Sequence, residues 1–145
     1  MDVLTYLTGN WHRIADLAGD HVVLSLQAVA LALAIGIPLG IACRLARPVA
    51  AIVLNAVSII YTIPTLALFG LMLPLIGIGI VPAVVAVVLY SLLPIVQNTY
   101  TGLTSVAPEI REAALGIGMG RLTRLVRVEL PLALPLMFAG FRVAV

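Results

Sequence analysis

The sequence contains no lysine, a single cysteine and few charged side chains of either sign. Charged residues make up 10% of the 145 residues, whereas soluble domains typically carry about 25%. Hydrophobic residues make up 63% of the chain, and the mean hydropathy is +1.22. A soluble domain of this length would expose much of that apolar surface to water. The composition therefore excludes a soluble domain, a disordered chain and a nucleic-acid-binding protein, and it predicts an integral membrane protein.

The scarcity of reactive side chains also excludes several kinds of site. Cys43 alone can form neither an intramolecular disulfide nor a cysteine-based metal site. His12 and His21 have no neighbouring nucleophile or ligand partner, so we expect no metal site and no catalytic residue. An intramembrane enzyme is disfavoured because no acid, nucleophile or metal-binding cluster lies within an apolar run. Asp2 and the absence of a preceding basic run argue against a cleaved signal peptide, so we expect residues 1–21 to be a retained extracytoplasmic segment.

Three uncharged stretches are long enough to cross a membrane, which requires about 20 apolar residues. The first is Val22 to Cys43, with 22 residues and no charge. The chain then runs for 61 residues without a charge, from Pro48 to Pro108, which suits two spans and a turn. We place these spans at about Val49 to Leu73 and Val81 to Tyr100, with the turn in the glycine-containing stretch at 75–80.

The end of the sequence is too short for a further complete span. Leu132 to Val145 form 14 positions, which reach about 21 Å as a helix against a hydrocarbon core of about 30 Å. We therefore read the chain as a fragment, and residues 22–145 as a C-terminally incomplete transmembrane domain. Arg142 interrupts this last stretch; a charge inside a span usually needs a partner in the bundle, and both a structural tether and a pathway role stay open. The predicted fold class is an all-α membrane bundle of about three full spans plus the start of a fourth.

The second span contains a predicted helix break. Pro64 lies after Tyr61 and Thr62 near the middle of the bilayer, and proline removes a backbone donor and crowds the preceding turn. One interpretation is an ordinary kink whose freed carbonyl finds another partner. The other is a break that lines a transport pathway. The rings of Tyr61, Tyr90 and Tyr100 can contact a quaternary ammonium group, although such aromatics more often serve packing.

The arginines predict the orientation in the membrane. Arg44 and Arg47 follow the first span, and the loop after the third span carries four more, namely Arg111, Arg121, Arg124 and Arg127. Two crossings separate these groups, so both lie on one side, which is cytoplasmic by the positive-inside rule. The N-terminus is then outside.

The cytoplasmic loop, at about residues 103–131, predicts two short helices. Pro108 suits the first position of a helix, Glu109 and Glu112 complement its positive end, and Gly116 can end it. Glycines at 116, 118 and 120 then permit a tight reversal. A second helix, Arg121 to Glu129, is expected near the membrane surface, with Leu122, Leu125, Val126 and Glu129 on one side and Arg121, Arg124 and Arg127 around the other. Without further information, this loop is an interfacial linker.

Spaced motifs in this loop resemble a known family. Glu112-Ala113-Ala114, Gly118 and the sequence Val128-Glu129-Leu130-Pro131 resemble the EAA loop of permeases from binding-protein-dependent ABC importers, with Val128 in place of isoleucine. Upstream, the segments 61–68, 75–79 and 92–102 resemble permeases of glycine betaine, choline, carnitine and proline importers. Ala139 to Arg142 is similar to a further segment of that group, with Phe141 as the departure.

The resemblance implies a mechanical role rather than catalysis. The EAA segment would be a coupling helix that docks on a separate ATPase subunit: Glu112 would pair with a cation there, Ala113 and Ala114 would permit close approach, and Gly118 would set the reversal before the closing Leu130 and Pro131. ATP would be bound by that partner, so no cofactor is expected in this chain. An extracytoplasmic binding protein and a second permease subunit would complete an osmolyte importer in the bacterial cytoplasmic membrane. The alternative is a truncated, transport-incompetent scaffold or assembly subunit derived from a permease.

Overall fold

The computed structural model describes residue 7 and residues 9–145, apart from the side chain of Arg47. Part of the predicted N-terminal segment 1–21 therefore lies outside the described residues. The described chain is helical and contains no strand. Its elements are α2 (Trp11–Leu45), α3 (Arg47–Thr62), α4 (Thr65–Ile76), α5 (Ile80–Thr104), α6 (Pro108–Gly116), α7 (Arg121–Arg124), the π-helical turn η1 (Leu125–Glu129) and α8 (Leu130–Ala144). The all-α prediction is confirmed.

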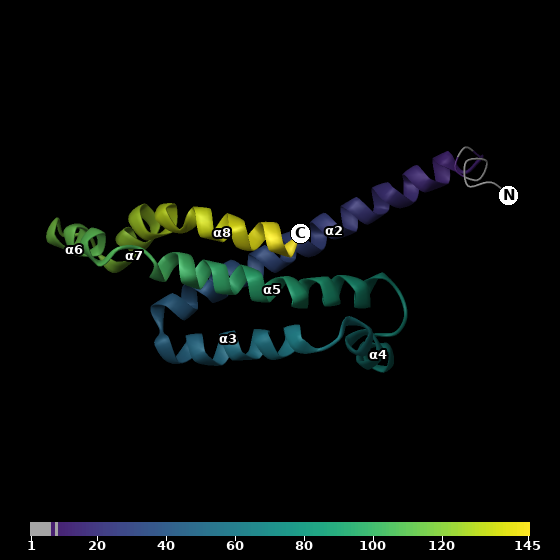
Figure 1. The fold of residues 1–145 in the computed structure, drawn as a ribbon, viewed down its shortest axis with the longest axis horizontal. Coiled ribbons are helices and arrows are strands. Elements are labelled where there is room, and N and C mark those ends of the chain that lie inside the picture. Colours follow the sequence, from purple (N-terminus) through teal and green to yellow (C-terminus); the bar gives the residue numbers. More distant parts are fainter. Residues whose placement is uncertain (1–6, 8) are drawn as a thin grey trace.

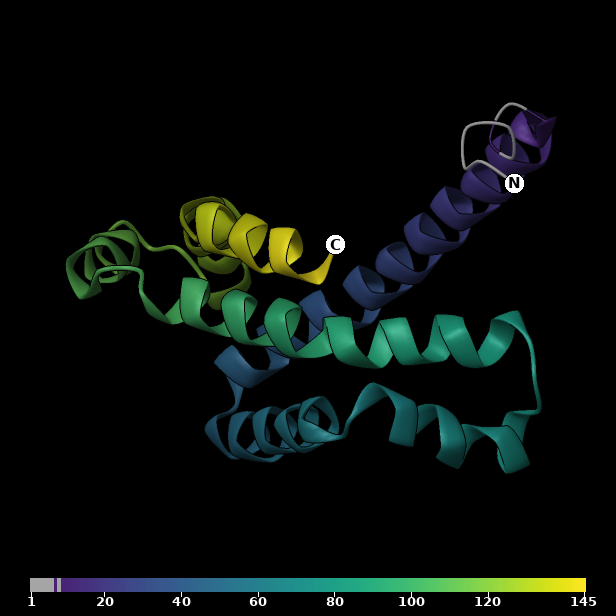
Figure 2. The ribbon, with the colours of Figure 1, turned by 45° about the vertical axis from the view of Figure 1, so that its right-hand side comes forward.

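Helix α5 is the central element of the bundle. It packs against α2, α8, α3 and α4, with α8 along one side and α3 along the other (Figure 1). The N-terminal part of α2 projects beyond the other helices (Figure 2). The C-terminal ends of α2 and α5 lie at the same end of the molecule as α6 and α7 (Figure 1). The arginine-containing segments that follow α2 and α5 therefore lie at this one end.

Small residues let α5 approach its neighbours closely. A Cβ atom added to Gly40 of α2 would lie 2.5 Å from Thr99 Cβ, and one added to Gly36 would lie 2.6 Å from Ile95 Cγ2. On the other side of α5, a Cβ atom at Gly140 of α8 would lie 2.6 Å from the carbonyl oxygen of Pro94. Because lipid tails are as apolar as the helices, close van der Waals packing of this kind is a main source of helix association in membranes.

Two helices, α2 and α5, are each long and apolar enough to cross a membrane. A third span exists only if Pro48–Thr62 and Thr65–Ile76 count as one crossing, because these two helices are bent by 98°. Helix α2 begins 11 residues before the apolar run that predicted it, and α5 extends beyond the predicted span at both ends. The predicted turn is present, since Gly77 and Gly79 between α4 and α5 both have positive φ angles, of 83° and 148°.

The break between α3 and α4 has a local cause. Ile63 and Pro64 are both extended, with ψ angles of 125° and 136°, as expected for the residue before proline and for the N-cap of the next helix. The carbonyl freed by the break is not left alone, because the hydroxyl of Tyr90 donates to the Ile63 carbonyl. The hydroxyl of Thr62 donates to the Ile59 carbonyl at 2.7 Å. The kink predicted at Pro64 is therefore a full break, at which the Ile59 and Ile63 carbonyls each accept a hydrogen bond from a hydroxyl group.

The helix predicted at 121–129 is present as α7 and η1, but it continues into α8 without a break, and the cap residues between these elements keep helical dihedral angles. The Leu130 N–H donates to the Leu125 carbonyl five residues earlier, which widens the turn. This wider turn also gives room to the carbonyl that the ring of Pro131 would crowd in a regular helix. The prediction that Leu122, Leu125, Val126 and Glu129 share one side is wrong, because Leu122 and Val126 are 72% and 54% exposed whereas Leu125 and Glu129 are buried.

Candidate functional site

Helix α6 has the bounds that the loop sequence predicts. It begins with Pro108 and ends with Gly116, and Glu109 lies in its first turn. Proline suits this position because its missing N–H would have no partner in the helix, and a carboxylate there complements the helix dipole.

Gly118 closes α6 with a two-bond cap. Its N–H donates to the Leu115 carbonyl at 2.9 Å, and the Met119 N–H donates to the Ala114 carbonyl at 3.0 Å. This is the Schellman arrangement, in which the residue after the C-cap adopts a left-handed conformation. Gly118 has a φ angle of 80°, whereas Gly116 and Gly120 have no positive φ. Among the three glycines that permit a reversal, Gly118 is the one that makes it.

Helix α6 has one inner and one outer face. Arg111 is half-buried and Ala114 is buried, whereas Glu112 and Ala113 are exposed. The apolar side chain of Ile110 is also exposed, at 41%. The two alanines of the motif therefore differ, because Ala114 faces the chain's own helices and Ala113 is exposed. The outer face of α6, defined by Glu109, Ile110, Glu112, Ala113 and Ile117, is exposed in the described structure.

Arg111 fixes the inner face of α6 to the end of α5. Its Nη2 donates to the Leu103 carbonyl at 2.6 Å and to the Thr104 carbonyl at 3.2 Å. These carbonyls belong to the last turn of α5, where the helix itself offers no donors and where the helix dipole favours a cation. The guanidinium of Arg111 therefore caps one helix while belonging to another.

Arg111 also points toward the buried carboxylate of Glu129, which was not predicted from the sequence as a site residue. The side chain of Glu129 is 4% exposed and forms ion pairs with three arginines. Its oxygens lie 3.1 Å from Arg124 Nε, 3.4 Å from Arg44 Nη2 and 3.7 Å from Arg111 Nε. We call these four residues the Glu129 cluster. The expectation that Arg124 lies away from Glu129 is wrong, because the π-helical turn changes which side chains share a face.

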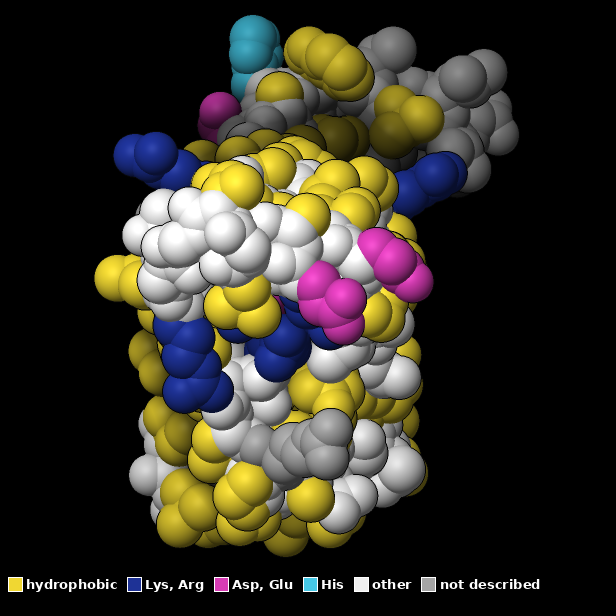
Figure 3. Space-filling model, turned by 90° about the vertical axis from the view of Figure 1, so that its left-hand side faces the viewer, with side chains coloured by type: hydrophobic (Ala, Val, Ile, Leu, Met, Phe, Trp, Pro, Cys, Tyr) yellow, Lys and Arg dark blue, Asp and Glu magenta, His cyan; other side chains and the backbone are white. Residues whose placement is uncertain are grey.

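One signal in the sequence could have identified this cluster. Glu129 is the only acidic residue between Glu112 and the last residue, and it follows three closely spaced arginines. A lone carboxylate at the start of an apolar helix needs a cation nearby. Figure 3 shows this end of the molecule, where basic side chains lie beside acidic ones within a largely hydrophobic surface.

The two motif residues after Glu129 differ in burial. Leu130 packs on a cluster of Leu103, Leu125 and Ala133, and Pro131 is exposed.

A second feature lies at the break between α3 and α4. A cavity of about 310 Å³ is lined by residues of α3, α4, α5 and α8, namely Tyr61, Thr65, Val87, Tyr90, Ser91, Pro94, Val143 and Ala144. The rings of Tyr61 and Tyr90 meet edge to face with centroids 5.8 Å apart. Thr62 and Pro64 are exposed beside this cavity. Tyr100 does not join them, because it packs against Cys43, Ala50 and Val96.

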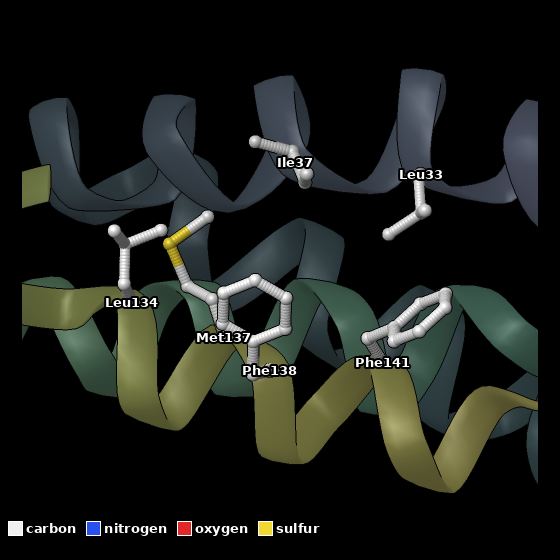
Figure 4. Close-up of a pocket in the computed structure, with 6 residues that line it drawn as sticks. All are labelled: Leu33, Ile37, Leu134, Met137, Phe138 and Phe141. Atoms are coloured by element: carbon white, nitrogen blue, oxygen red, sulfur yellow. The ribbon is translucent and has the colours of Figure 1, made fainter. Parts of the chain in front are cut away.

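Arg142 lies apart from this cavity. It is exposed on α8 and forms no ion pair with any residue whose side chain is described. A second cavity, of about 220 Å³, lies between α2 and α8, with Leu33 and Ile37 facing four side chains of α8 (Figure 4). Its six lining residues are all apolar. Within the described part of the chain, no group of three His, Cys, Asp or Glu residues is placed to hold a metal ion.

Comparisons with known proteins agree with the arrangement of these helices. Residues 32–145 match the family described as binding-protein-dependent transport system inner membrane component. The osmoprotectant import permease protein OsmW of Salmonella typhimurium is 49% identical over 150 residues, which cover 100% of this chain and 70% of that protein. Two Bacillus subtilis proteins are also similar. The glycine betaine/carnitine/choline transport system permease protein OpuCB is 40% identical, and the choline transport system permease protein OpuBB is 39% identical.

The chain spans about two thirds of the length of these relatives. The match covers 97% of this chain and 64% of each Bacillus protein. The matched residues include α6, the Glu129 cluster and the helix break, and the family match covers four fifths of the chain. The chain therefore belongs to the family of inner membrane components of binding-protein-dependent transport systems.

Proposed function

We propose that this chain is the membrane-spanning subunit of an ATP-driven importer of quaternary-amine osmolytes, of the glycine betaine, choline, carnitine and proline class. The observation that carries this proposal is the construction of α6: one face is tied to the bundle through Arg111 and Ala114, and the opposite face is free. A short helix that is fixed on one side and bare on the other is suited to transmit force between two proteins. The names of the relatives support the substrate class.

In this proposal the outer face of α6 docks on a cytoplasmic ATPase subunit. Ile110 and Ile117 offer apolar contact, since they are 41% and 74% exposed. Ala113 allows the backbone of α6 to come close to the partner, and Glu112 pairs with a cation of the ATPase. Closing of two ATPase subunits on ATP would move α6 and, through it, the membrane helices. ATP binds to the partner, and an extracytoplasmic binding protein delivers the solute to a pair of permease subunits.

We propose further that the break between α3 and α4 lines the transport pathway. Tyr61 lines the cavity described above, and Thr62 and Pro64 lie between its lining residues Tyr61 and Thr65 in the sequence. Tyr61 and Tyr90 could present ring faces to a quaternary ammonium group. Arg142 is proposed as a second pathway residue because an exposed charge on a membrane helix requires water or a partner. This orientation puts α6 in the cytoplasm and the N-terminus outside the bacterial inner membrane.

The experiment that tests this function is reconstitution. The permease is purified with the ATPase and the binding protein encoded beside it and is placed in lipid vesicles. ATP hydrolysis is then measured with empty binding protein and with binding protein loaded with glycine betaine, choline or carnitine. Stimulation by a loaded binding protein, together with uptake of the solute, is the expected result. ATPase binding without stimulation or uptake would favour the transport-incompetent scaffold instead.

A further inference from the structure

We propose that Glu129 is a positioning residue that locks the coupling helix to the membrane helices, so that a displacement of α6 moves α2, α5 and α8 together. The proposal deepens the function proposed above and rests on it for its transport consequences. Its structural content, a rigid connection between α6 and the end of α2, stands on the geometry of the Glu129 cluster alone.

The first step of the argument is connectivity. The carboxylate of Glu129 receives Arg44 from the end of α2, Arg111 from α6 and Arg124 from α7. Arg111 adds the end of α5 through the carbonyls of Leu103 and Thr104. Glu129 itself is the last residue of η1 and leads directly into α8. Residues of α2, α6 and α7 thus meet at one carboxylate, which is joined through Arg111 to the end of α5 and through the chain to α8.

The second step is charge. One carboxylate faces three guanidinium groups, and arginine cannot shed its proton to relieve the imbalance. Among the side chains that the structure describes, Arg44 Nε and Arg111 Nε are buried without a hydrogen-bond partner. The attraction to Glu129 is therefore the interaction that compensates these two buried Nε groups, while Arg111 is also held by its hydrogen bonds to the Leu103 and Thr104 carbonyls. Removal of the Glu129 charge leaves three guanidinium groups close together in a site with little water. Because they repel one another and no anion compensates them, we expect them to separate.

The third step is the weakness of the other attachments of α6. Ala114 and Arg111 are the residues of α6 that face inward, and the remainder of the helix is exposed. Helix α6 packs mainly on α7 and η1, the segments that carry Arg124 and Glu129. Without the cluster, α6 keeps its fold through the Gly118 cap but loses its fixed place relative to α2. Since coupling requires that motion be transmitted, loss of this lock uncouples ATP hydrolysis from transport.

The test uses Glu129→Gln, which keeps the shape of the side chain and an oxygen that can accept from Arg124. The matched control is Asp20→Asn, which removes an exposed carboxylate of α2 that lies outside the Glu129 cluster and outside the outer face of α6. Spin labels are placed at Leu45→Cys and Leu115→Cys in a Cys43→Ala background, because these leucines are 48% and 55% exposed. The distance distribution between the labels is measured by double electron–electron resonance in the permease in lipid.

A single narrow peak is expected for the parent and for Asp20→Asn, and loss of that peak is expected for Glu129→Gln. In the complete transporter, Glu129→Gln should retain ATPase co-purification while substrate-stimulated uptake falls about tenfold or more. An unchanged distance distribution in Glu129→Gln overturns the lock, whatever the transport result.

If Glu129→Gln fails to insert, Arg44→Gln removes one connection only and should broaden the same distribution. An unchanged peak in Arg44→Gln also overturns the lock. Absence of transport in the parent transporter would instead contradict the proposed function. The distance measurement would still test whether Glu129 fixes α6 to the end of α2, because it does not depend on transport.

Discussion

Two adjacent residues of α6, Arg111 and Glu112, lie on different faces of the helix. Arg111 is half-buried and bonds to the end of α5, whereas Glu112 is exposed and forms no ion pair within the described structure. An exposed carboxylate contributes little to the stability of its own protein, since surface pairs are worth about 0–1 kcal/mol. The proposed function therefore assigns Glu112 to the interface with the ATPase, where loss of water would strengthen its pairing with a cation.

The Glu112→Ala variant tests this assignment. We expect normal membrane levels, because no contact within the chain is lost, and weaker binding of the ATPase together with lower uptake. Loss of a charged hydrogen bond at a buried interface costs about 2–5 kcal/mol, or at least about 30-fold in affinity. Membrane level, ATPase co-purification and betaine uptake are measured side by side with Asp20→Asn, which removes an exposed carboxylate outside α6. Full transport by Glu112→Ala, or a loss that merely follows disappearance from the membrane, contradicts the assignment.

Gly118 offers a second test at the scale of one residue. Its φ angle of 80° is left-handed, and a side chain in that conformation costs roughly 1–2 kcal/mol. Gly118→Ala should therefore loosen the cap of α6 and reduce ATPase binding and transport. The control is Gly116→Ala, because Gly116 lies in the helix and a Cβ atom there meets nothing within 4 Å. Equal activity of the two variants in the uptake assay would show that the reversal at Gly118 is dispensable.

At the scale of elements, the main feature is the break between α3 and α4. Two carbonyls at this break, those of Ile59 and Ile63, accept hydrogen bonds from Thr62 and Tyr90, which lowers the cost of the bent backbone in the membrane interior. Irregular backbone at membrane depth is tolerated where it is buried in protein or lines a water-filled cavity. The cavity at Tyr61 and Tyr90 makes the second case the one to test.

The accessibility of Thr62 distinguishes a pathway from plain packing. In a Cys43→Ala background, Thr62→Cys should react with a small water-soluble thiol reagent, at a rate that changes when ATP is bound. Ile52→Cys on α3 is the control, since Ile52 is 71% exposed on an apolar helix and should face lipid. Protection of Thr62→Cys in every nucleotide state, at the level of Ile52→Cys, would favour plain packing.

The elements were predictable from sequence where a local signal sets them. Pro108 and Gly116 bound α6, the glycines at 77 and 79 end α4, and Pro64 breaks the second span. Each of these effects depends on the residue's own backbone. The bend of 98° could not be predicted, because its size depends on the partners that Tyr90 and α5 supply.

The Glu129 cluster was missed for the same reason. A regular helical period puts Glu129 on a side shared with Leu122 and Val126, but η1 changes the register before α8 begins. The ion pairs also join residues that are far apart in the sequence, such as Arg44 and Glu129. Composition can indicate that a buried carboxylate needs a cation, and only the fold decides which one it receives.

For the whole molecule, the distribution of charge and the arrangement of helices agree. Arg44, Arg111 and Arg124 come from three separate segments and meet at one end, where α6 also lies (Figure 1). The positive-inside rule assigns that end to the cytoplasm. The orientation decides whether α6 can reach a cytoplasmic ATPase at all.

Labelling from the two sides of the membrane tests the orientation. A cysteine at Gly9 should react with an impermeant reagent added to intact cells, because it precedes the first span. A cysteine at Thr123, which is exposed on α7, should react only after permeabilisation. Both variants carry Cys43→Ala, and the unsubstituted Cys43→Ala protein is the blank. The reverse pattern would move α6 to the outside and remove the basis for coupling.

The most direct measurement of the central claim is protection of the outer face of α6 by the ATPase. Ala113→Cys in a Cys43→Ala background puts a thiol in the middle of that face, and its labelling rate is followed with and without the ATPase subunit. The account predicts rapid labelling of the permease alone and labelling slowed about tenfold or more in the complex, because interface cores exclude water. Thr123→Cys, outside that face, should be labelled at the same rate in both samples. Equal labelling of Ala113→Cys with and without a bound ATPase would contradict the claim that α6 is the docking helix.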